Sequence, residues 1–289
     1  MGEKVGGSAA SPLPLRERSI RAEGEDRVRG AVARAEGPLT RSFGCASGST
    51  SPARGEVRSP RVALVIPTLN EEEAIGPLLA RVPPGVVKTI IVADGGSRDR
   101  TVERALAQGA IVIEAGRGYG RACREGALAA GEDCDIVVFM DGDGADKPEL
   151  ISRLAAPIAR GEADFVIGSR LRGHRDKGSM SLHQIAAGLL LGAAMRLLYG
   201  VRYTDMCAFR AIRRSCLMGL EMREMGYGWN IEMQMRAAAA KLRILELPVD
   251  YGLRAGGTSK VAGSLGGALR AGYRIVATFI RVWRETRRA

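Results

Sequence analysis

Two aspartates one residue apart are the feature of this sequence best suited to chemistry. Asp141 and Asp143 follow the apolar run of residues 135–140, and a glycine after each permits a tight turn. Two carboxylates on such a turn can hold one hard divalent cation, because Mg²⁺ and Mn²⁺ prefer oxygen ligands. The alternative is an acidic turn that caps the helix beginning at Pro148. The spacing predicts a site for Mg²⁺ or Mn²⁺ with both aspartates as ligands.

Other residue types leave little room for different chemistry. The only histidines are His174 and His183, and none of the five cysteines stands at C-x-x-C spacing. This argues against a histidine-built metal site, a structural zinc site and a disulfide framework, and it suits a reducing cytosol. The net charge of +11 favours an anionic partner, which can be nucleic acid, a phosphorylated substrate or an acidic membrane. Aromatic residues make up only 4% of the chain, which argues against nucleic acid.

The elements that carry these residues alternate between strands and helices. Short continuous apolar runs are separated by helical stretches, which is typical of a mostly parallel sheet covered on both faces. The sequence therefore predicts an α/β domain. The predicted strands are residues 62–66, 89–93, 110–113, 135–140 and 163–167, and the predicted helices are residues 74–81, 99–108, 120–130 and 148–160.

The ends of the predicted strands locate the site. Ligands of such sheets bind in the crevice at the carboxyl ends of the strands. The residues found there are polar, Gly-rich and acidic, and they are 67–71, 94–97, 141–143 and 168–170. We expect them to line one crevice.

Two glycine-rich turns need separate interpretation. Asp94 begins the turn DGGS, where it can face the crevice while Ser97 or Asp99 caps the next helix. The turn at residues 116–120, GRGYG, lacks the G-x-G-x-x-G spacing of dinucleotide-binding folds. It predicts instead that Arg117 approaches a phosphate ahead of a helix N-terminus.

Seven motifs in order resemble glycosyltransferase family 2, and within it the dolichyl- or polyprenyl-phosphate hexosyltransferases. The resemblance covers about residues 61–263. The motifs are IPTLNE (66–71), VADGGSRD (92–99), FMDGD (139–143), ADFVIGSR (163–170), TD with FR (204–205 and 209–210), GYGWNIE (226–232) and RAGGTSK (254–260).

The resemblance implies a GT-A fold and an inverting transfer from a GDP- or UDP-sugar. It places Asp141 and Asp143 on the metal that bridges the donor diphosphate. The other donor contacts that it implies are Pro67, Asn70 and Glu71 at the nucleoside, Asp94 at the base or ribose, and Arg254 and Lys260 at the phosphates. Two positions depart from the family pattern, Gly95 in the DGGS turn and Ala145 after the metal pair. Water or Asp146 would then complete the metal coordination.

The acceptor is open between two classes. A polyprenyl phosphate attacks without a general base and needs cations, for which Arg170 and the basic segment of Arg172, His174, Arg175 and Lys177 are candidates. That segment is otherwise a solvated loop. A soluble hydroxyl acceptor would require a base, for which Asp205 is the first candidate and Glu232 the second. A small phosphorylated acceptor is a further alternative. Trp229 either stacks on a sugar or packs.

Two functions other than glycosyl transfer are alternatives. A nucleotidyltransferase would carry a phosphate-binding loop after the first strand, where this chain has PTLN (67–70). A binding-only module has no catalytic turnover. If Asp141→Asn abolishes turnover while the fold persists, this alternative is excluded. The sequence does not identify the sugar.

The two ends of the chain differ from the middle. Residues 1–60 are predicted to be a disordered extension, residues 61–263 the catalytic domain and residues 264–289 a basic amphipathic helix. In that helix five arginines (270, 274, 281, 284 and 288) lie opposite an apolar side. It is compatible either with an anionic membrane interface or with docking of its apolar face on the domain or on a second subunit. The apolar stretch 182–199 favours a core or interfacial helix over a membrane span. No signal peptide or spanning segment is predicted, so we expect a cytoplasmic protein, compatible with peripheral attachment to the membrane.

Overall fold

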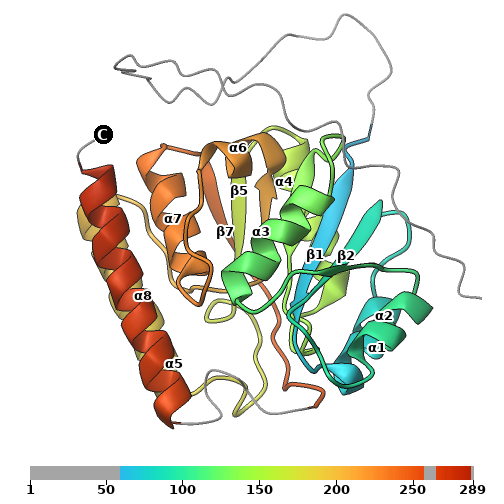
Figure 1. Cartoon of the computed structure of the whole chain (residues 1–289). Coiled ribbons are helices and arrows are strands. Elements are labelled where there is room, and N and C mark those ends of the chain that lie inside the picture. The colour runs from blue at the N-terminus through green and yellow to red at the C-terminus, as the bar shows by residue number, and fades with distance from the viewer. Residues whose placement is uncertain (1–58, 257–264, 288–289) are drawn as a thin grey trace, which may run out of the picture. The chain divides into compact units, whose positions relative to one another are not determined.

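The computed structural model describes residues 59–256 and 265–287 (Figure 1). Lys260 and nearly all of the predicted extension lie outside the described residues. The domain boundaries given above therefore stay predictions.

A seven-stranded mixed sheet forms the centre of the domain. Its strand order is β3-β2-β1-β4-β6-β5-β7, and only β6 runs antiparallel to its neighbours. The five predicted strands are confirmed, whereas β6 and β7 were not predicted. The strands are β1 (Val62–Thr68), β2 (Thr89–Asp94), β3 (Ile111–Glu114), β4 (Ile136–Phe139), β5 (Phe165–Ser169), β6 (Arg210–Arg213) and β7 (Ile244–Pro248).

Apolar burial on both faces explains the continuous strands. The side chains of Leu64, Val65 and Ile66 point alternately to the two faces of the sheet, and all are fully buried. Strands β4 and β5 are buried along their whole length. Because both faces are covered, only the strand ends are open to a ligand.

Helices cover this sheet, and the four that were predicted are confirmed. Helix α3 packs on β1 and β2, α4 packs on β4, β5 and β6, and α1 packs on α2. The predicted helix 148–160 is a short 3₁₀ turn, Pro148–Leu150, that continues into α4. The helices are α1 (Glu72–Ala80), α2 (Thr101–Ala107), α3 (Tyr119–Ala129), α4 (Ile151–Ala159), α5 (Leu182–Tyr199), α6 (Arg214–Gly219), α7 (Trp229–Ala239) and α8 (Leu265–Thr286).

Helix α5 has clear start and stop signals but little burial. A capping box of Ser181 and Gln184 begins it, and Gly200 ends it in the left-handed conformation. The only residues that α5 buries are Gly188, Gly192 and Met195. Placement in the core is therefore wrong for most of this helix. By length and composition it could cross a membrane, and it is the one helix among the described residues for which this holds.

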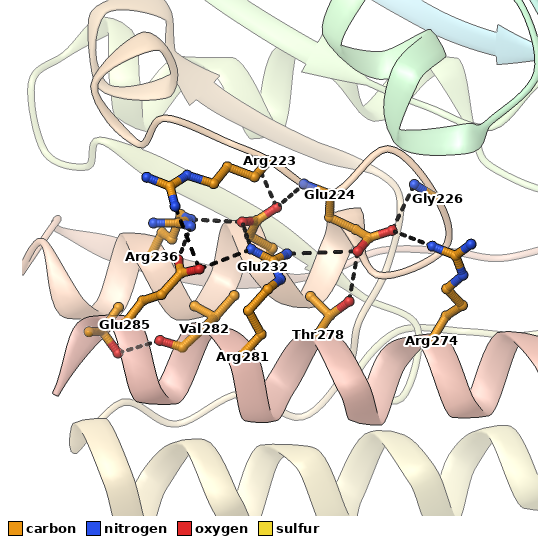
Figure 2. Close-up of polar contacts among 11 residues, drawn as sticks. Arg223, Glu224, Gly226, Glu232, Arg236, Arg274, Thr278, Arg281, Val282 and Glu285 are labelled. Carbon is orange, nitrogen blue, oxygen red and sulfur yellow. Dashed lines mark hydrogen bonds and ion pairs between the residues drawn. The ribbon is translucent and has the colours of Figure 1, made fainter. Parts of the chain in front are cut away.

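Helix α8 is docked on α7 and on the loop before α7 by charged groups (Figure 2). Glu232 is fully buried and accepts a hydrogen bond from Arg281 of α8 at 3.4 Å. Glu224 accepts one from Thr278 of α8 at 2.9 Å and lies 3.9 Å from Arg274. Two of the arginines expected on one face therefore pair with acidic residues of the domain. Of the two interpretations of this helix, docking on the domain is therefore correct for the inner side of α8.

Candidate active site

The carboxyl ends of β1, β2 and β4 bring the predicted polar residues to one edge of the sheet. Thr68 and Asp94 are register partners at the ends of β1 and β2. Asp141 lies two residues beyond Phe139, the last residue of β4. The shared edge follows from the parallel pairing of these three strands.

Three carboxylates lie together after β4. Asp143 and Asp146 are buried, and Asp146 accepts a hydrogen bond from the Asp141 backbone N–H at 3.3 Å. Burial and the negative charge of Asp143 raise the pKa of Asp141 to about 6. Burial and the charges of Asp141 and Asp143 raise the pKa of Asp146 well above its usual value. Gathering like charges in one buried place is unfavourable unless a cation compensates them.

A divalent cation fits this place. One carboxylate oxygen of Asp146, Oδ1, is buried and has no hydrogen-bond partner among the described residues. Within the described part of the chain, no group of three or more His, Cys, Asp or Glu side chains is placed to hold a metal ion, so any cation here would have at most two of these carboxylates as ligands. Two carboxylates that leave positions open to substrate phosphates are the usual binding mode of Mg²⁺. The donor set of Asp141 and Asp143, with Asp146 beside it, suits such an open site.

Tyr119 is a residue of this site that the sequence did not single out. Its hydroxyl lies close enough to Asp141 to lower the pKa of that carboxyl, and Asn230 of α7 lies on its other side. Burial raises the pKa of Tyr119 well above its usual value, so the hydroxyl stays protonated and can donate. The glycines on either side of Tyr119 are the feature of the sequence that could have indicated its place in the site. A Cβ at Gly118 or Gly120 would collide with the backbone of Met225 or Glu224, so the turn presses against that loop.

Arg254 connects the metal pair to the predicted nucleoside pocket. It donates to Asp143 at 2.7 Å and to Glu71 at 3.0 Å. The backbone N–H of Ala255 also donates to the Asp143 carbonyl at 2.9 Å, which fixes this segment over the turn. The Arg254 guanidinium is in direct contact with Asp143. The structure therefore brings Glu71, Asp143 and Arg254 together, and their roles toward a donor stay predictions.

Asp94 is engaged within its own loop, and Asn70 is bonded to that same loop from the end of β1. The Asp94 carboxylate accepts hydrogen bonds from the backbone N–H groups of Gly96 and Ser97 and from the Ser97 hydroxyl, at 2.9, 2.9 and 2.5 Å. Asn70 has a positive φ of 51°, and its side chain accepts from the Arg98 N–H at 2.8 Å. These bonds hold the two loops beside the half-buried Pro67. Contact of Asp94 or Asn70 with a nucleoside stays a prediction.

Asp99, not Ser97, bonds to the first residue of α2, whose N-cap residue is Arg100 and makes no side-chain capping bond. Its carboxylate accepts from both the backbone N–H and the hydroxyl of Thr101, at 3.0 and 2.5 Å. The Thr101 hydroxyl in turn accepts from the N–H of Glu71 at 2.8 Å. Asp99 and Thr101 thus also support the loop that carries Glu71.

Arg170 and Asp205 form a buried bidentate pair after β5. Asp205 accepts from two guanidinium nitrogens of Arg170, at 2.8 and 2.7 Å, and from its backbone N–H at 2.9 Å. Burial raises the pKa of Asp205, but the bonds from Arg170 outweigh it and hold that pKa below its usual value. The guanidinium also lies 5.0 Å from the ring centroid of Tyr251, a residue that no sequence motif indicated. Asp205 thus orients Arg170, and its lowered pKa does not suit a general base.

The remaining candidates divide between the surface and the interior. Arg117 is exposed directly before the N-terminus of α3, where a phosphate can reach it. The segment with Arg172 and His174 is exposed beyond Arg170. Trp229 is only 2% exposed and packs edge-on against Phe139, so packing is the correct interpretation. Glu232 belongs to the α8 docking network, which removes the second candidate base.

Sequence comparisons identify several relatives. Residues 63–220 match the family described as Glycosyl transferase family 2. An uncharacterised glycosyltransferase of Mycobacterium tuberculosis is 36% identical over 213 residues, covering 73% of this chain and 94% of that protein. The undecaprenyl-phosphate mannosyltransferase of Micrococcus luteus is 30% identical, covering 72% and 90%. The polyprenol monophosphomannose synthase of Mycolicibacterium smegmatis is 30% identical, covering 71% and 82%.

A solved structure with the same arrangement has a different acceptor. Glucosyl-3-phosphoglycerate synthase from Mycobacterium tuberculosis, in complex with Mn²⁺, UDP and glucosyl-3-phosphoglycerate, superposes with a TM-score of 0.62. It is 25% identical, and the match covers 77% of this chain and 80% of that chain. The comparisons therefore include both lipid-phosphate and soluble acceptors.

Proposed function

The chain belongs to glycosyltransferase family 2 and has the GT-A fold, and on this premise we propose that it transfers a hexose from a nucleoside-diphosphate sugar to polyprenyl phosphate. The transfer is metal-dependent and inverts the anomeric centre. An acceptor phosphate oxygen bonds to the anomeric carbon while the bond from that carbon to the diphosphate breaks.

The observation that carries this proposal is the cluster of Asp141 and Asp143 beside two arginines. Arg254 contacts Asp143, and the charge of Arg170 acts on Asp141. A site with carboxylates for a cation and guanidinium groups for phosphates suits a substrate pair with three phosphate groups.

Each residue of the site then has a defined task. Bound Mg²⁺ or Mn²⁺ would neutralise charge on the leaving diphosphate. Tyr119 holds the Asp141 carboxylate in place through its hydroxyl. Arg254 moves its charge from Asp143 to the donor phosphates, joined in the family pattern by Lys260. Arg170, fixed by Asp205, presents a cation to the acceptor phosphate.

A lipid phosphate is the preferred acceptor for two reasons. The names of two relatives state such an activity, and each match covers more than two thirds of both chains. Asp205 is bound to Arg170, and Glu232 is bound in the α8 network, so neither is available as the base that a hydroxyl acceptor needs. A small phosphorylated acceptor remains the second candidate, because the structure that superposes on this chain was solved with glucosyl-3-phosphoglycerate. A lipid acceptor also places the protein at the cytoplasmic face of a membrane.

The test is a transfer assay with the full chain and radiolabelled GDP-mannose, UDP-glucose or a UDP-N-acetylhexosamine, with Mn²⁺ or Mg²⁺. Each donor is offered polyprenyl phosphate in detergent, and separately 3-phosphoglycerate in buffer. We expect label in the organic phase with one donor and its loss on chelation. Transfer only to 3-phosphoglycerate would reject the lipid acceptor. Hydrolysis or transfer that Asp141→Asn leaves unchanged would reject the site.

A further inference from the structure

The outer sides of the neighbouring helices α5 and α8 both carry exposed apolar side chains, which together we call the α5–α8 face. The helices run side by side (Figures 1 and 2), and the hydroxyls of Tyr199 and Thr286 lie 2.7 Å apart. The six most exposed large apolar side chains on these helices define the face. They are Leu182, Leu190, Leu197, Leu269, Tyr273 and Val276, and each is at least 55% exposed.

The inner sides of both helices are already engaged with the domain. On α8, Ala271, Thr278 and Val282 are buried, and these positions lie on the side opposite Tyr273 and Val276. On α5, Gly192 lies so close to the Tyr203 carbonyl that a Cβ there would overlap it. The α5–α8 face is therefore an additional surface, not the side by which the helices dock. Exposed apolar surface of this kind marks an interaction site.

The charge around the α5–α8 face has one sign. Helix α5 contains no acidic residue, and the only one in α8, Glu285, is bonded to Arg236 at 2.5 Å. Arg196, Arg270 and Arg284 are exposed on the two helices and form no ion pair within the described part of the chain. Exposed apolar side chains flanked by arginine are the composition that binds an anionic lipid interface.

The exposed apolar side chains and the arginines indicate one binding partner for the α5–α8 face. We propose that the α5–α8 face is the surface by which the protein lies on an anionic membrane, with the apolar side chains in the interface and the arginines at the lipid headgroups. A second copy of the chain fits less well, because a symmetric contact would place the same arginine-flanked patch against itself. Helix α5 lies in the interface and does not cross the membrane, since its glycine side is packed on the domain.

Helix α5 follows closely after the candidate active site in the chain, so a membrane bound to the α5–α8 face would lie near that site. The segment 171–181 leaves Arg170 at the end of β5 and leads directly into α5, whose first residue, Leu182, is 85% exposed. The membrane surface thus begins next to the cationic segment proposed for the acceptor phosphate. This use rests on the proposed function, whereas membrane binding itself does not require a lipid acceptor.

The experiment measures co-sedimentation of the full chain with vesicles that contain neither acceptor nor donor. Vesicles of phosphatidylcholine with phosphatidylglycerol are compared with vesicles of phosphatidylcholine alone. The variants are Leu190→Glu, Val276→Glu and Arg284→Glu, and Leu106→Glu is the matched control. Leu106 is 56% exposed on α2, which lies at the right of Figure 1, whereas α5 and α8 lie at the left. Thermal melting verifies that every variant is folded, and light scattering gives its oligomeric state.

We expect binding to the anionic vesicles, loss of most of it in the two apolar-site variants, and no change in Leu106→Glu. Arg284→Glu should weaken binding at least about fivefold, the worth of one arginine at an anionic surface. Absence of sedimentation by the unaltered chain would overturn the proposal. A dimer that Val276→Glu dissociates, without an effect on vesicles, would also overturn it. Vesicle binding by a protein that glycosylates only soluble acceptors would keep this surface and reject the lipid acceptor.

Discussion

Replacing Arg254 by methionine should have opposite effects on metal binding and on catalysis. In the donor-free protein a metal must displace Arg254 from Asp143, where the guanidinium donates at 2.7 Å. A hydrogen bond between charged groups contributes about 1.5–3 kcal/mol. Because Arg254 is 29% exposed, we take the lower value, which corresponds to about a tenfold change in an equilibrium constant. Arg254→Met should therefore bind Mn²⁺ about tenfold more tightly.

Catalysis should respond in the other direction. Once the donor is bound, the same arginine is expected on the diphosphate, and losing one such stabilising group lowers the rate about a hundredfold. Calorimetric titration with Mn²⁺, at a pH above the pKa of Asp141, gives the affinity, and the transfer assay gives kcat/KM. Arg160→Met is the matched control, because Arg160 is 58% exposed and is bonded to Glu162 rather than to the metal pair. Unchanged or weaker Mn²⁺ binding by folded Arg254→Met would refute the competition.

Other perturbations test the rest of the site. Asp143→Asn should lower transfer by about three orders of magnitude with the melting temperature retained, as measured by kcat/KM and thermal melting. Since the pKa of Asp141 is raised to about 6, the metal-free fold holds this proton below pH 6 and loses stability as pH rises from about 4 to 6. Mn²⁺ should therefore raise the melting temperature more at pH 7 than at pH 5. Asp205→Asn should leave Arg170 buried without its ion partner and destabilise the fold by about 3 kcal/mol in denaturant titration, together with a lower kcat/KM. Glu224→Gln should weaken α8 docking by about 1–2 kcal/mol in the same titration, with Mn²⁺ affinity unchanged.

Much of the fold follows from local sequence pattern. A strand buried on both faces needs consecutive apolar residues, so runs such as 62–66 identify themselves without tertiary information. The site edge followed too, because parallel strands end together and their last residues are polar. Strands β6 and β7 were not predicted, because polar side chains interrupt their short apolar stretches. Arg210 opens β6, and its guanidinium is buried in the core and donates to backbone carbonyls, which no periodicity indicates.

The sequence by itself indicated the candidate metal pair, the sheet edge and the family, since each can be recognised from short motifs whose residues are neighbours in the chain. The tertiary structure decided which distant groups complete the site. Tyr119 reaches Asp141 from α3, and Arg254 reaches Asp143 from a segment 111 residues further along. It also decided that Asp205 orients an arginine, and that α8 packs Phe279, Val282 and Trp283 on the domain beside its acid-paired arginines while Tyr273 and Val276 stay outside. The reason is physical: hydrogen bonds, ion pairs and pKa values depend on neighbours in space, and only folding sets those neighbours.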